Sequence, residues 1–427
     1  MKRFILAPIF LLFLLPLKAQ HKAIDFTVNG LKVILRPTEK ETVSIRMFYR
    51  GGVMNYAPGQ AGIENMALTT AATGGSKNYS AADYKELNDE FGIEIQGSSG
   101  TDYGTITMDC ISKYLDKGWN FFADAVVNPA FEQPEFQSSK EKTIARIHSQ
   151  NADPESRIEK LSMSAIFQDS PYSTDPTGTE EIVTNFRIKQ VKDYYYQTLL
   201  NKNRMFLVVA GKITKEELEK KILASLSSIP EAPYTLPVYD QKLMEGEKLL
   251  TEQRDLATNY ISCVMNAPPM NNPDYLPFML SINALSSHLF YELRTKQSLS
   301  YSPGATIKSL QIPYMSMYVS TTQPVKAYQA IVNVYKNMRS NLFSQSLLAD
   351  IKKNHKRTYY RHQESSSAIA EDLGKAEIFG DYRIEENKIA SINKVSCQDM
   401  LNAVNKYLKG AIWIYLGDEQ AGKAAFQ

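Results

Sequence analysis

The sequence predicts an α+β protein that contains one structural unit twice. The order of one strand, a helix, two paired strands and two helices starts near Val43 and again near Thr258, about 215 residues later. Residues 228–237 lie between the two copies and contain three prolines, which exclude both a helix and a central strand. The 427 residues are enough for two domains, and 43% hydrophobic and 22% charged residues are typical of globular proteins.

The N-terminus has the pattern of a secretory signal peptide. Lys2 and Arg3 precede an apolar run over residues 4–17, and a polar stretch follows. A membrane anchor is the alternative, but this run has fourteen residues with two prolines, whereas a span needs about 20 apolar residues. We therefore expect residues 1–20 to be removed on export, which leaves a chain without a membrane span.

The first half is predicted to form a hairpin, a third strand, two helices, two paired strands and two longer helices. The hairpin turn falls at Asn29-Gly30, a pair suited to the positive backbone angles of a tight turn. Ser80 and Asp83 form a capping box for the second helix, and Gly92 ends it. In chain order we expect these elements at residues 24–37, 43–49, 62–73, 81–91, 93–98, 103–111, 115–127 and 134–150.

The second half repeats this order without a hairpin at its start. We expect strands and helices at residues 259–267, 273–294, 302–307, 314–321, 325–339 and 346–374. The chain is thereby divided into an N-terminal domain, a linker and a C-terminal domain, at residues 21–230, 231–245 and 246–427.

Composition argues against several classes of partner and site. The formal net charge is +2, from 48 basic and 46 acidic side chains, so no large positive field attracts nucleic acid or an anionic membrane. Cys110, Cys263 and Cys397 are far apart and odd in number, which predicts neither a disulfide framework nor a clustered zinc motif.

The motifs of common hydrolases are missing from the sequence. A zinc peptidase helix needs two imidazoles four residues apart and a carboxylate base, yet neither H-E-x-x-H nor H-x-x-E-H occurs. His355 and His362 are seven residues apart, about 10 Å along a helix, so we interpret them as solvated side chains rather than a ligand pair. No G-x-S-x-G nucleophile elbow occurs either.

Arg294 and Tyr301 are the most informative side chains of the second half. Arg294 falls near the end of a predicted helix and Tyr301 just before the next strand. A guanidinium offers a rigid fork of donors to a carbonyl or carboxylate, and a phenol can donate to a developing oxyanion. The alternative is structural, with an arginine that complements the helix dipole and a tyrosine at an interface.

The segment from Leu289 to Tyr301 is similar to the Leu-Phe-x-x-Leu-Arg-x-x-x-x-Leu-x-Tyr signature of pitrilysin-like and insulinase-like zinc peptidases. The resemblance covers essentially the whole mature chain. It implies two homologous α/β-sandwich domains of the clamshell type, each a mixed, mostly antiparallel sheet with helices, around a chamber for short unfolded peptides. Other landmarks occur in the family's order, at Gly51-Gly52, Gly62-Ile63, residues 128–131, Asp153-Pro154, Pro171-Tyr172, Gly178-Thr179 and residues 204–211.

The resemblance also implies a degenerate metal site. Active members carry H-x-x-E-H on the first helix, and the positions that match its three functional residues hold Asn65, Leu68 and Thr69. The position of the family's third metal ligand, a glutamate, is matched by Arg146. We therefore expect no zinc in this chain, because both imidazoles, the general base and the last carboxylate are replaced.

Bacterial two-chain members of the family divide the labour between a zinc-bearing subunit and one that carries the arginine and tyrosine pair. This chain resembles the second kind, which implies that Arg294 binds the substrate backbone or carboxylate and that Tyr301 stabilises the oxyanion. The zinc is then expected in a homologous partner subunit, and both chains in the bacterial periplasm. The alternatives are an inactive homologue that holds peptides or serves as a structural subunit, and a peptidase with relocated ligands.

Overall fold

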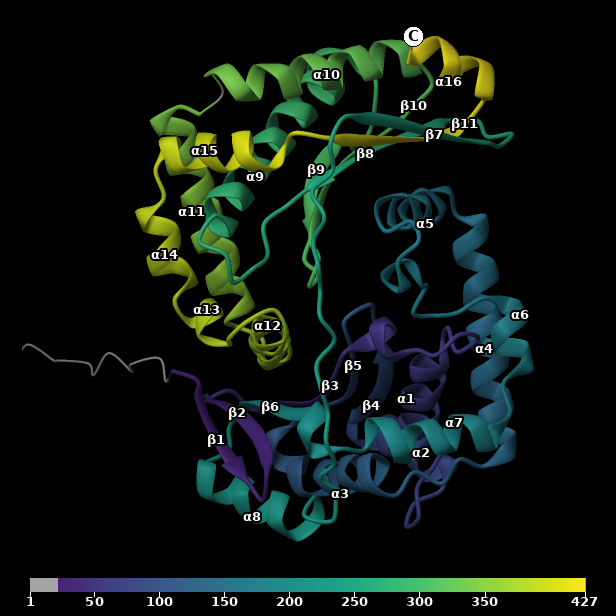
Figure 1. Cartoon of the computed structure of the whole chain (residues 1–427). Helices are drawn as coiled ribbons and strands as arrows, with labels where there is room; N and C mark the ends of the chain where they lie inside the picture. The colour runs from purple at the N-terminus through teal and green to yellow at the C-terminus, as the bar shows by residue number, and fades with distance from the viewer. Residues whose placement is uncertain (1–21, 342, 427) are drawn as a thin grey trace, which may run out of the picture.

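The computed structural model describes residues 22–341 and 343–426. The predicted signal peptide, residues 1–20, lies outside the described residues. Two sheets, each covered by helices, are joined by a long connection (Figure 1). The predicted α+β fold with two mixed, mostly antiparallel sheets is confirmed.

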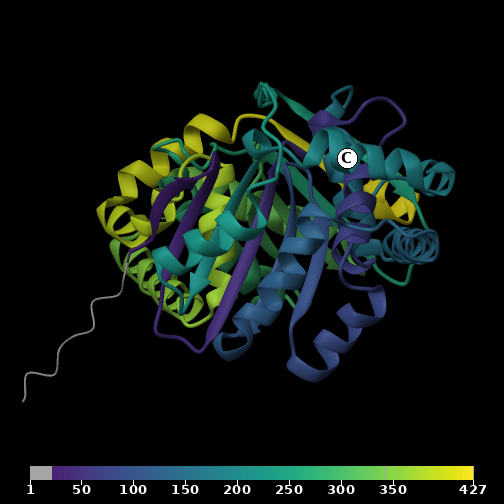
Figure 2. The same cartoon turned by 90° about the horizontal axis from the view of Figure 1, so that it is seen from below.

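The first sheet has six strands in the order β1-β2-β6-β3-β5-β4. Only β2 and β6 pair in parallel, and the other neighbours are antiparallel. The predicted hairpin is confirmed, with positive φ angles of 45° at Asn29 and 82° at Gly30. Figure 2 shows these strands side by side. They are β1 (Ile24–Val28), β2 (Leu31–Pro37), β3 (Thr42–Arg50), β4 (Glu94–Ser99), β5 (Tyr103–Ile111) and β6 (Met205–Gly211).

The second sheet has five strands in the order β7-β11-β8-β10-β9. Its one parallel pair, β7 with β11, stands where β2 and β6 stand in the first sheet, so the two sheets share one topology. Strand β1 has no counterpart among the described strands of the second sheet. The strands are β7 (Glu247–Gln253), β8 (Asn259–Asn266), β9 (Gly304–Lys308), β10 (Tyr314–Thr321) and β11 (Ala411–Gly417).

Helices cover both sheets. Ser80 and Asp83 form the predicted capping box, and Gly92 ends that helix with a left-handed φ of 60°. The helices of the first half are α1 (Ile63–Thr73), α2 (Ala81–Phe91), α3 (Leu115–Val127), α4 (Gln133–Ala152), α5 (Pro154–Ile166), α6 (Glu180–Asn185), α7 (Ile188–Tyr194) and α8 (Lys215–Ser225). Shorter helical turns are η1 (Gly52–Asn55), η2 (Ser112–Tyr114), η3 (Pro171–Ser173), η4 (Tyr195–Leu199) and η5 (Lys202–Arg204).

The helices of the second half correct one prediction. A single helix over residues 346–374 is wrong, because the Ser365 hydroxyl accepts a hydrogen bond from the Ala368 backbone N–H and starts a new helix. The helices are α9 (Tyr275–Leu289), η6 (Phe290–Lys296), α10 (Pro324–Asn341), α11 (Gln345–His362), α12 (Ser366–Ile378), α13 (Arg383–Glu386), α14 (Lys388–Lys394), α15 (Cys397–Tyr407) and α16 (Glu419–Ala425). No helix among the described residues is both long and apolar enough to span a bilayer.

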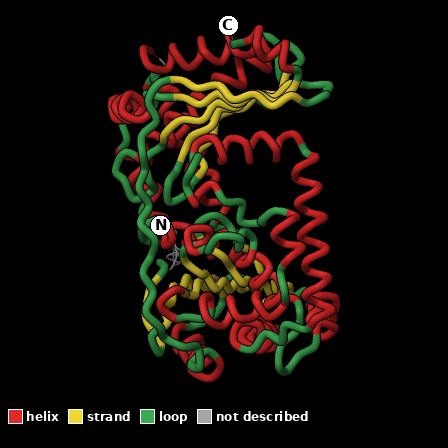
Figure 3. Tube along the Cα trace, turned by 45° about the vertical axis from the view of Figure 1, so that its right-hand side comes forward, coloured by secondary structure: helices red, strands yellow, loops and turns green. Residues whose placement is uncertain are grey.

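Each half donates one helix to the sheet of the other half. Helix α12 packs on β3 and β6 of the first sheet, and a Cβ at Gly374 would lie 2.1 Å from the Phe48 ring, so only glycine permits this approach. Helix α5 of the first half packs on β8 and β11 of the second sheet. Figure 3 shows the second sheet as one layer between helices. This exchange makes the two sheets parts of one packed body.

A buried carboxylate joins the two halves. Asp102, in the turn between β4 and β5, accepts a hydrogen bond from the Tyr172 hydroxyl at 2.6 Å. Its other oxygen accepts from the backbone N–H of Gln311, in the turn between β9 and β10, at 3.1 Å. Burial raises the pKa of Asp102 from 3.8 to about 6, although both hydrogen bonds favour the charged form.

Replacing Asp102 with asparagine should remove one pH dependence of stability. Folding raises the pKa of this carboxyl, so the folded state holds the proton more tightly than the unfolded state. The wild type should gain about 2 kcal/mol relative to Asp102→Asn as the pH falls from about 7.5 to about 4.5. Urea unfolding at several pH values measures this difference, with Asp255→Asn, at an exposed carboxylate, as the control. Parallel stability curves for wild type and Asp102→Asn would contradict the assignment.

Candidate functional site

Helix α1 carries three of the four positions that the resemblance matches to metal-site residues, and it lies directly on strands β4 and β5. A Cβ added at Gly97 would stand 2.0 Å from the Leu68 carbonyl oxygen, and one at Gly104 would stand 2.2 Å from Leu68 Cδ1. The clash at Gly97 is with backbone, so this position requires glycine, whereas a side chain at Gly104 would displace the end of Leu68. The helix is therefore held close to the edge of the first sheet.

The four degenerate positions do not form a metal site. Asn65 is 2% exposed, and its Nδ2 has no hydrogen-bond partner among the described residues. Leu68 is fully buried, Thr69 donates its hydroxyl hydrogen to the Gly97 carbonyl at 3.2 Å, and Arg146 is exposed on α4. An amide, an apolar chain, a hydroxyl and a guanidinium do not fit zinc, which prefers thiolate, imidazole and carboxylate. The described residues also hold no cluster of three His, Cys, Asp or Glu side chains suited to a metal.

A fully buried ion pair fixes α1 beside these positions. The Arg204 guanidinium donates to the Glu64 carboxylate at 2.6 Å, and both side chains are 0% exposed. Ser99 and Tyr194 donate to the same carboxylate, at 3.0 and 3.3 Å. Burial raises the pKa of Glu64, while Arg204 and the hydrogen bonds act in the opposite direction. Nearly every polar atom of the pair has a partner, as buried charges require.

Arg294 and Tyr301 come together at the end of α9. The helix continues into the π-helix η6, which carries Arg294, and the chain turns back at Ser298 with a positive φ of 53°. Arg294 Nη1 donates to the Tyr301 carbonyl at 2.8 Å, and its guanidinium carbon lies 4.3 Å from the centre of the Tyr301 ring. Tyr301 is 78% exposed. The phenol is therefore oriented by the arginine and open to a ligand.

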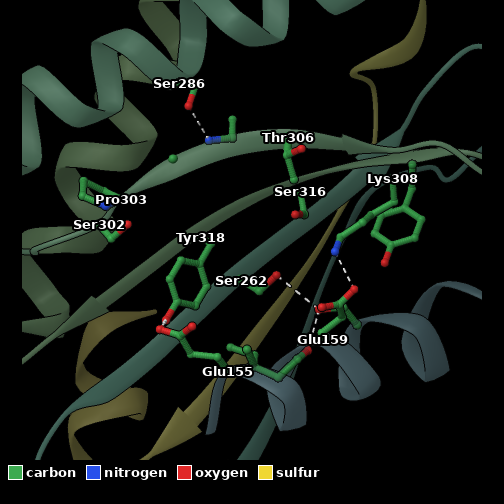
Figure 4. Close-up of a pocket in the computed structure, with 15 residues that line it drawn as sticks. Glu155, Glu159, Ser262, Ser286, Ser302, Pro303, Thr306, Lys308, Ser316 and Tyr318 are labelled. Atoms are coloured by element: carbon green, nitrogen blue, oxygen red, sulfur yellow. Dashed lines mark hydrogen bonds and ion pairs between the residues drawn. The ribbon is translucent and has the colours of Figure 1, made fainter. Parts of the chain in front are cut away.

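A hollow of about 440 Å³ lies between α5 and the strands β9 and β10, and neither Arg294 nor Tyr301 lines it (Figure 4). Ser302 and Pro303, the next two residues, line one end, and α5 forms the floor beneath β9 and β10. Its lining is rich in hydroxyl groups, several of them already engaged. The Tyr318 hydroxyl donates to Glu155 at 2.9 Å, as Figure 4 shows. This surface can offer hydrogen bonds to a polar chain without a large net charge.

A second hollow of about 810 Å³ lies on the other side of an ion pair between Lys308 and Glu159. Both of these residues line both hollows, and the pair links α5 of the first half with β9 of the second. Gln150, one turn beyond Arg146 on α4, lines the second hollow and has a buried Oε1 without a partner among the described residues. The second hollow thus lies against the helix that carries Arg146, although none of the four degenerate positions lines it.

The sequence pattern singled out Arg294 and Tyr301, which the structure brings into contact, but it did not predict the contacts around α1 or around the two hollows. Glu64 immediately precedes Asn65, and Arg204 lay within a landmark, yet nothing in the sequence connects residues 140 positions apart. The Lys308–Glu159 pair has no signal in the sequence either, because it depends on the helix exchanged between the halves.

The fold contains one α/β sandwich twice, with helix α1 packed on the edge strands of the first sheet. Residues 32–180 match the family described as insulinase (peptidase family M16), and residues 185–354 match the peptidase M16 inactive domain. The chain belongs to this family.

The names of relatives in the family differ in the activity that they state. The zinc protease PqqE of Helicobacter pylori is 23% identical over 416 residues, which cover 91% of this chain and 90% of that protein. The non-peptidase homolog YmxG of the same species is 19% identical over 317 residues, which cover 72% and 73%. The crystal structure of a protease from Helicobacter pylori has a TM-score of 0.85 at 18% identity, covering 93% of this chain and 100% of that one. That likeness shows the shared fold.

Replacing Glu64 with glutamine should destabilise the protein by about 3–5 kcal/mol, because Arg204 is left as a buried, unpaired charge. The double change Glu64→Leu with Arg204→Met should recover part of the loss, since it removes both charges together but leaves the Ser99 and Tyr194 hydroxyls without their acceptor. Urea unfolding measures both effects. Glu219→Gln, which breaks an exposed pair with Lys215, is the matched control and should cost less than about 0.5 kcal/mol. A loss of that small size for Glu64→Gln would contradict the role of the buried pair.

Proposed function

We propose that this chain is the non-catalytic subunit of a heterodimeric zinc peptidase, and that it supplies substrate-binding and oxyanion-stabilising groups to a homologous zinc-bearing partner. The observation that carries the proposal is the pairing of Arg294 with an exposed Tyr301 beside a hollow. The replaced metal positions on α1 support the division of labour. Zinc, when bound in the partner, supplies the activated water.

The chemistry of the pair suits a peptide substrate. The Arg294 guanidinium keeps donors free beyond the one that holds the Tyr301 carbonyl, so it can bind a peptide carbonyl or terminal carboxylate. The Tyr301 hydroxyl makes no hydrogen bond within the described residues and can donate to an oxyanion. The neighbouring hydroxyl-rich hollow gives room for the rest of a short, extended peptide.

The proposed location is the bacterial periplasm. The basic, then apolar, N-terminus of residues 1–20 supports export. The nearly balanced charge of +2 gives no reason to expect binding to an anionic membrane surface or to nucleic acid.

A peptide-holding or structural subunit is the second candidate. Similarity to YmxG, a non-peptidase homolog, favours it. In that case the assembled partner would turn over peptides equally well with or without an intact Arg294 and Tyr301.

Tyr301→Phe should lower the turnover of the assembled peptidase by about two to three orders of magnitude, because one oxyanion donor is lost. The turnover is measured as hydrolysis of a quenched fluorescent peptide library. Three samples are compared: this chain alone, a homologous subunit that carries H-x-x-E-H alone, and the mixture of both. We expect activity only in the mixture. Arg294→Lys should also impair it, since an ammonium cannot reproduce the guanidinium fork.

The matched control is Tyr291→Phe. Tyr291 lies on the π-helix η6, as Arg294 does, and is 55% exposed. The Arg294 guanidinium stacks over the Tyr301 ring rather than over the ring of Tyr291. Turnover by the control should equal that of the wild type. Equal activity of Tyr301→Phe and Tyr291→Phe, or no activity in any mixture, would favour the peptide-holding or structural candidate.

A further inference from the structure

Strand β7 forms an edge of the second sheet that differs from its counterpart in the first. The equivalent strand of the first sheet, β2, is covered on its outer side by β1. Among the described strands, β11 is the only one that pairs with β7. All residues of β7 except Glu252 are exposed, including Leu249 and Leu250 at 41% and 47%. An edge of this kind is a template for a further strand.

The neighbouring hydrogen bonds show which backbone groups of β7 point outward. The Gly246 carbonyl accepts from Ala411 N–H at 2.9 Å, and Arg254 N–H donates to the Gly417 carbonyl at 3.0 Å. Even-numbered residues therefore direct their backbone groups toward β11. Because these groups alternate along a strand, Glu247, Leu249, Thr251 and Gln253 direct theirs away from the sheet.

We propose that a second copy of this chain adds to the edge, with β7 of each copy paired antiparallel about Leu250. In this register Leu249 lies opposite Thr251 of the other copy as a hydrogen-bonded pair, so every outward N–H and C=O group of β7 has a partner. Leu250 of one copy then lies opposite Leu250 of the other copy. This is a non-hydrogen-bonded pair, in which the side chains are closest. Two five-stranded sheets become one continuous sheet.

Charge complementarity selects a second copy as the occupant. The same register places Lys248 of each copy opposite Glu252 of the other, so two ion pairs flank the central leucines. Lys248, Leu250 and Glu252 pair with Ile412, Ile414 and Leu416 of β11, so they share one face of the sheet. Among the described edge strands β1, β4, β7 and β9, β7 alone has opposite charges placed symmetrically about its centre.

One side of each interchain pair is held in place before association. Arg157 on α5 donates to the Glu252 carboxylate through two nitrogens, and Arg254 contacts it at 3.0 Å. The carboxylate therefore loses little side-chain freedom when Lys248 of the other copy arrives. The contact between two seven-residue strands is small, so we expect a concentration-dependent dimer with a Kd on the order of 10 μM.

Sedimentation velocity of the chain without residues 1–20, from about 1 to about 100 μM, tests the proposal. The wild type should shift from monomer to dimer. Lys248→Glu and Glu252→Lys should each be monomeric, because each sets like charges opposite one another twice. An equimolar mixture of the two variants should dimerise again, since every pair is then of opposite charge. A dimer formed through any other surface would not be restored by mixing these two variants.

Leu250→Lys provides a second disruption, and Leu223→Lys, at a 54% exposed position on α8, is its matched control. Circular dichroism establishes that each variant is folded. A wild type that is monomeric at about 100 μM, or a dimer that survives both Lys248→Glu and Leu250→Lys, would overturn the proposal. A monomeric chain whose β7 variants fail to bind the zinc-bearing subunit would instead assign the edge to that partner. The test uses neither peptide nor partner for its main result, so it is independent of the proposed function.

Discussion

The exchange of helices between the two halves is the constraint on which the rest of the structure depends. Helix α12 brings Ile369 and Leu373 against Phe48 and Phe206 of the first sheet, and α5 brings Ile158 against the second. Each such side chain contributes about 1.5–3 kcal/mol when fully buried. Neither half could bury these apolar faces alone. The relative position of the sheets, and hence the two hollows between α5 and β9, follows from this packing.

The second constraint is the buried ion pair that holds α1 in place. The resemblance implies that Leu68 occupies the position at which active relatives have a carboxylate. Here that position holds an apolar side chain that is fully buried. The neighbouring Glu64 carboxylate is paired with Arg204, and it accepts hydrogen bonds from two hydroxyl groups. A buried pair of this kind adds little net stability but strongly penalises any other arrangement of its partners. It therefore specifies the position of α1 more than it stabilises it.

The fold was predictable from the sequence where local patterns determine it. The hairpin at Asn29-Gly30 and the capping box at Ser80 depend on neighbouring residues, and both occur as predicted. The break at Ser365 was missed because the helical pattern continues on both sides of the serine cap that starts α12, and this helix then packs on the first sheet. The candidate site shows the same division. Arg294 and Tyr301 are seven residues apart and recognisable together, whereas Glu64 with Arg204 and Glu159 with Lys308 meet only after folding.

The exposure of Tyr301 links the proposed chemistry to assembly. A hydrogen bond to an oxyanion contributes most where water is excluded, because the interaction is then weakly screened. A phenol that is 78% exposed in the single chain cannot meet that condition by itself. Arg294 already fixes the direction of the ring, so what the site lacks is a cover rather than a conformational change. Under the proposed function, a partner that covers Tyr301 would supply both the zinc and the dry environment, so the proposed activity would require the pair.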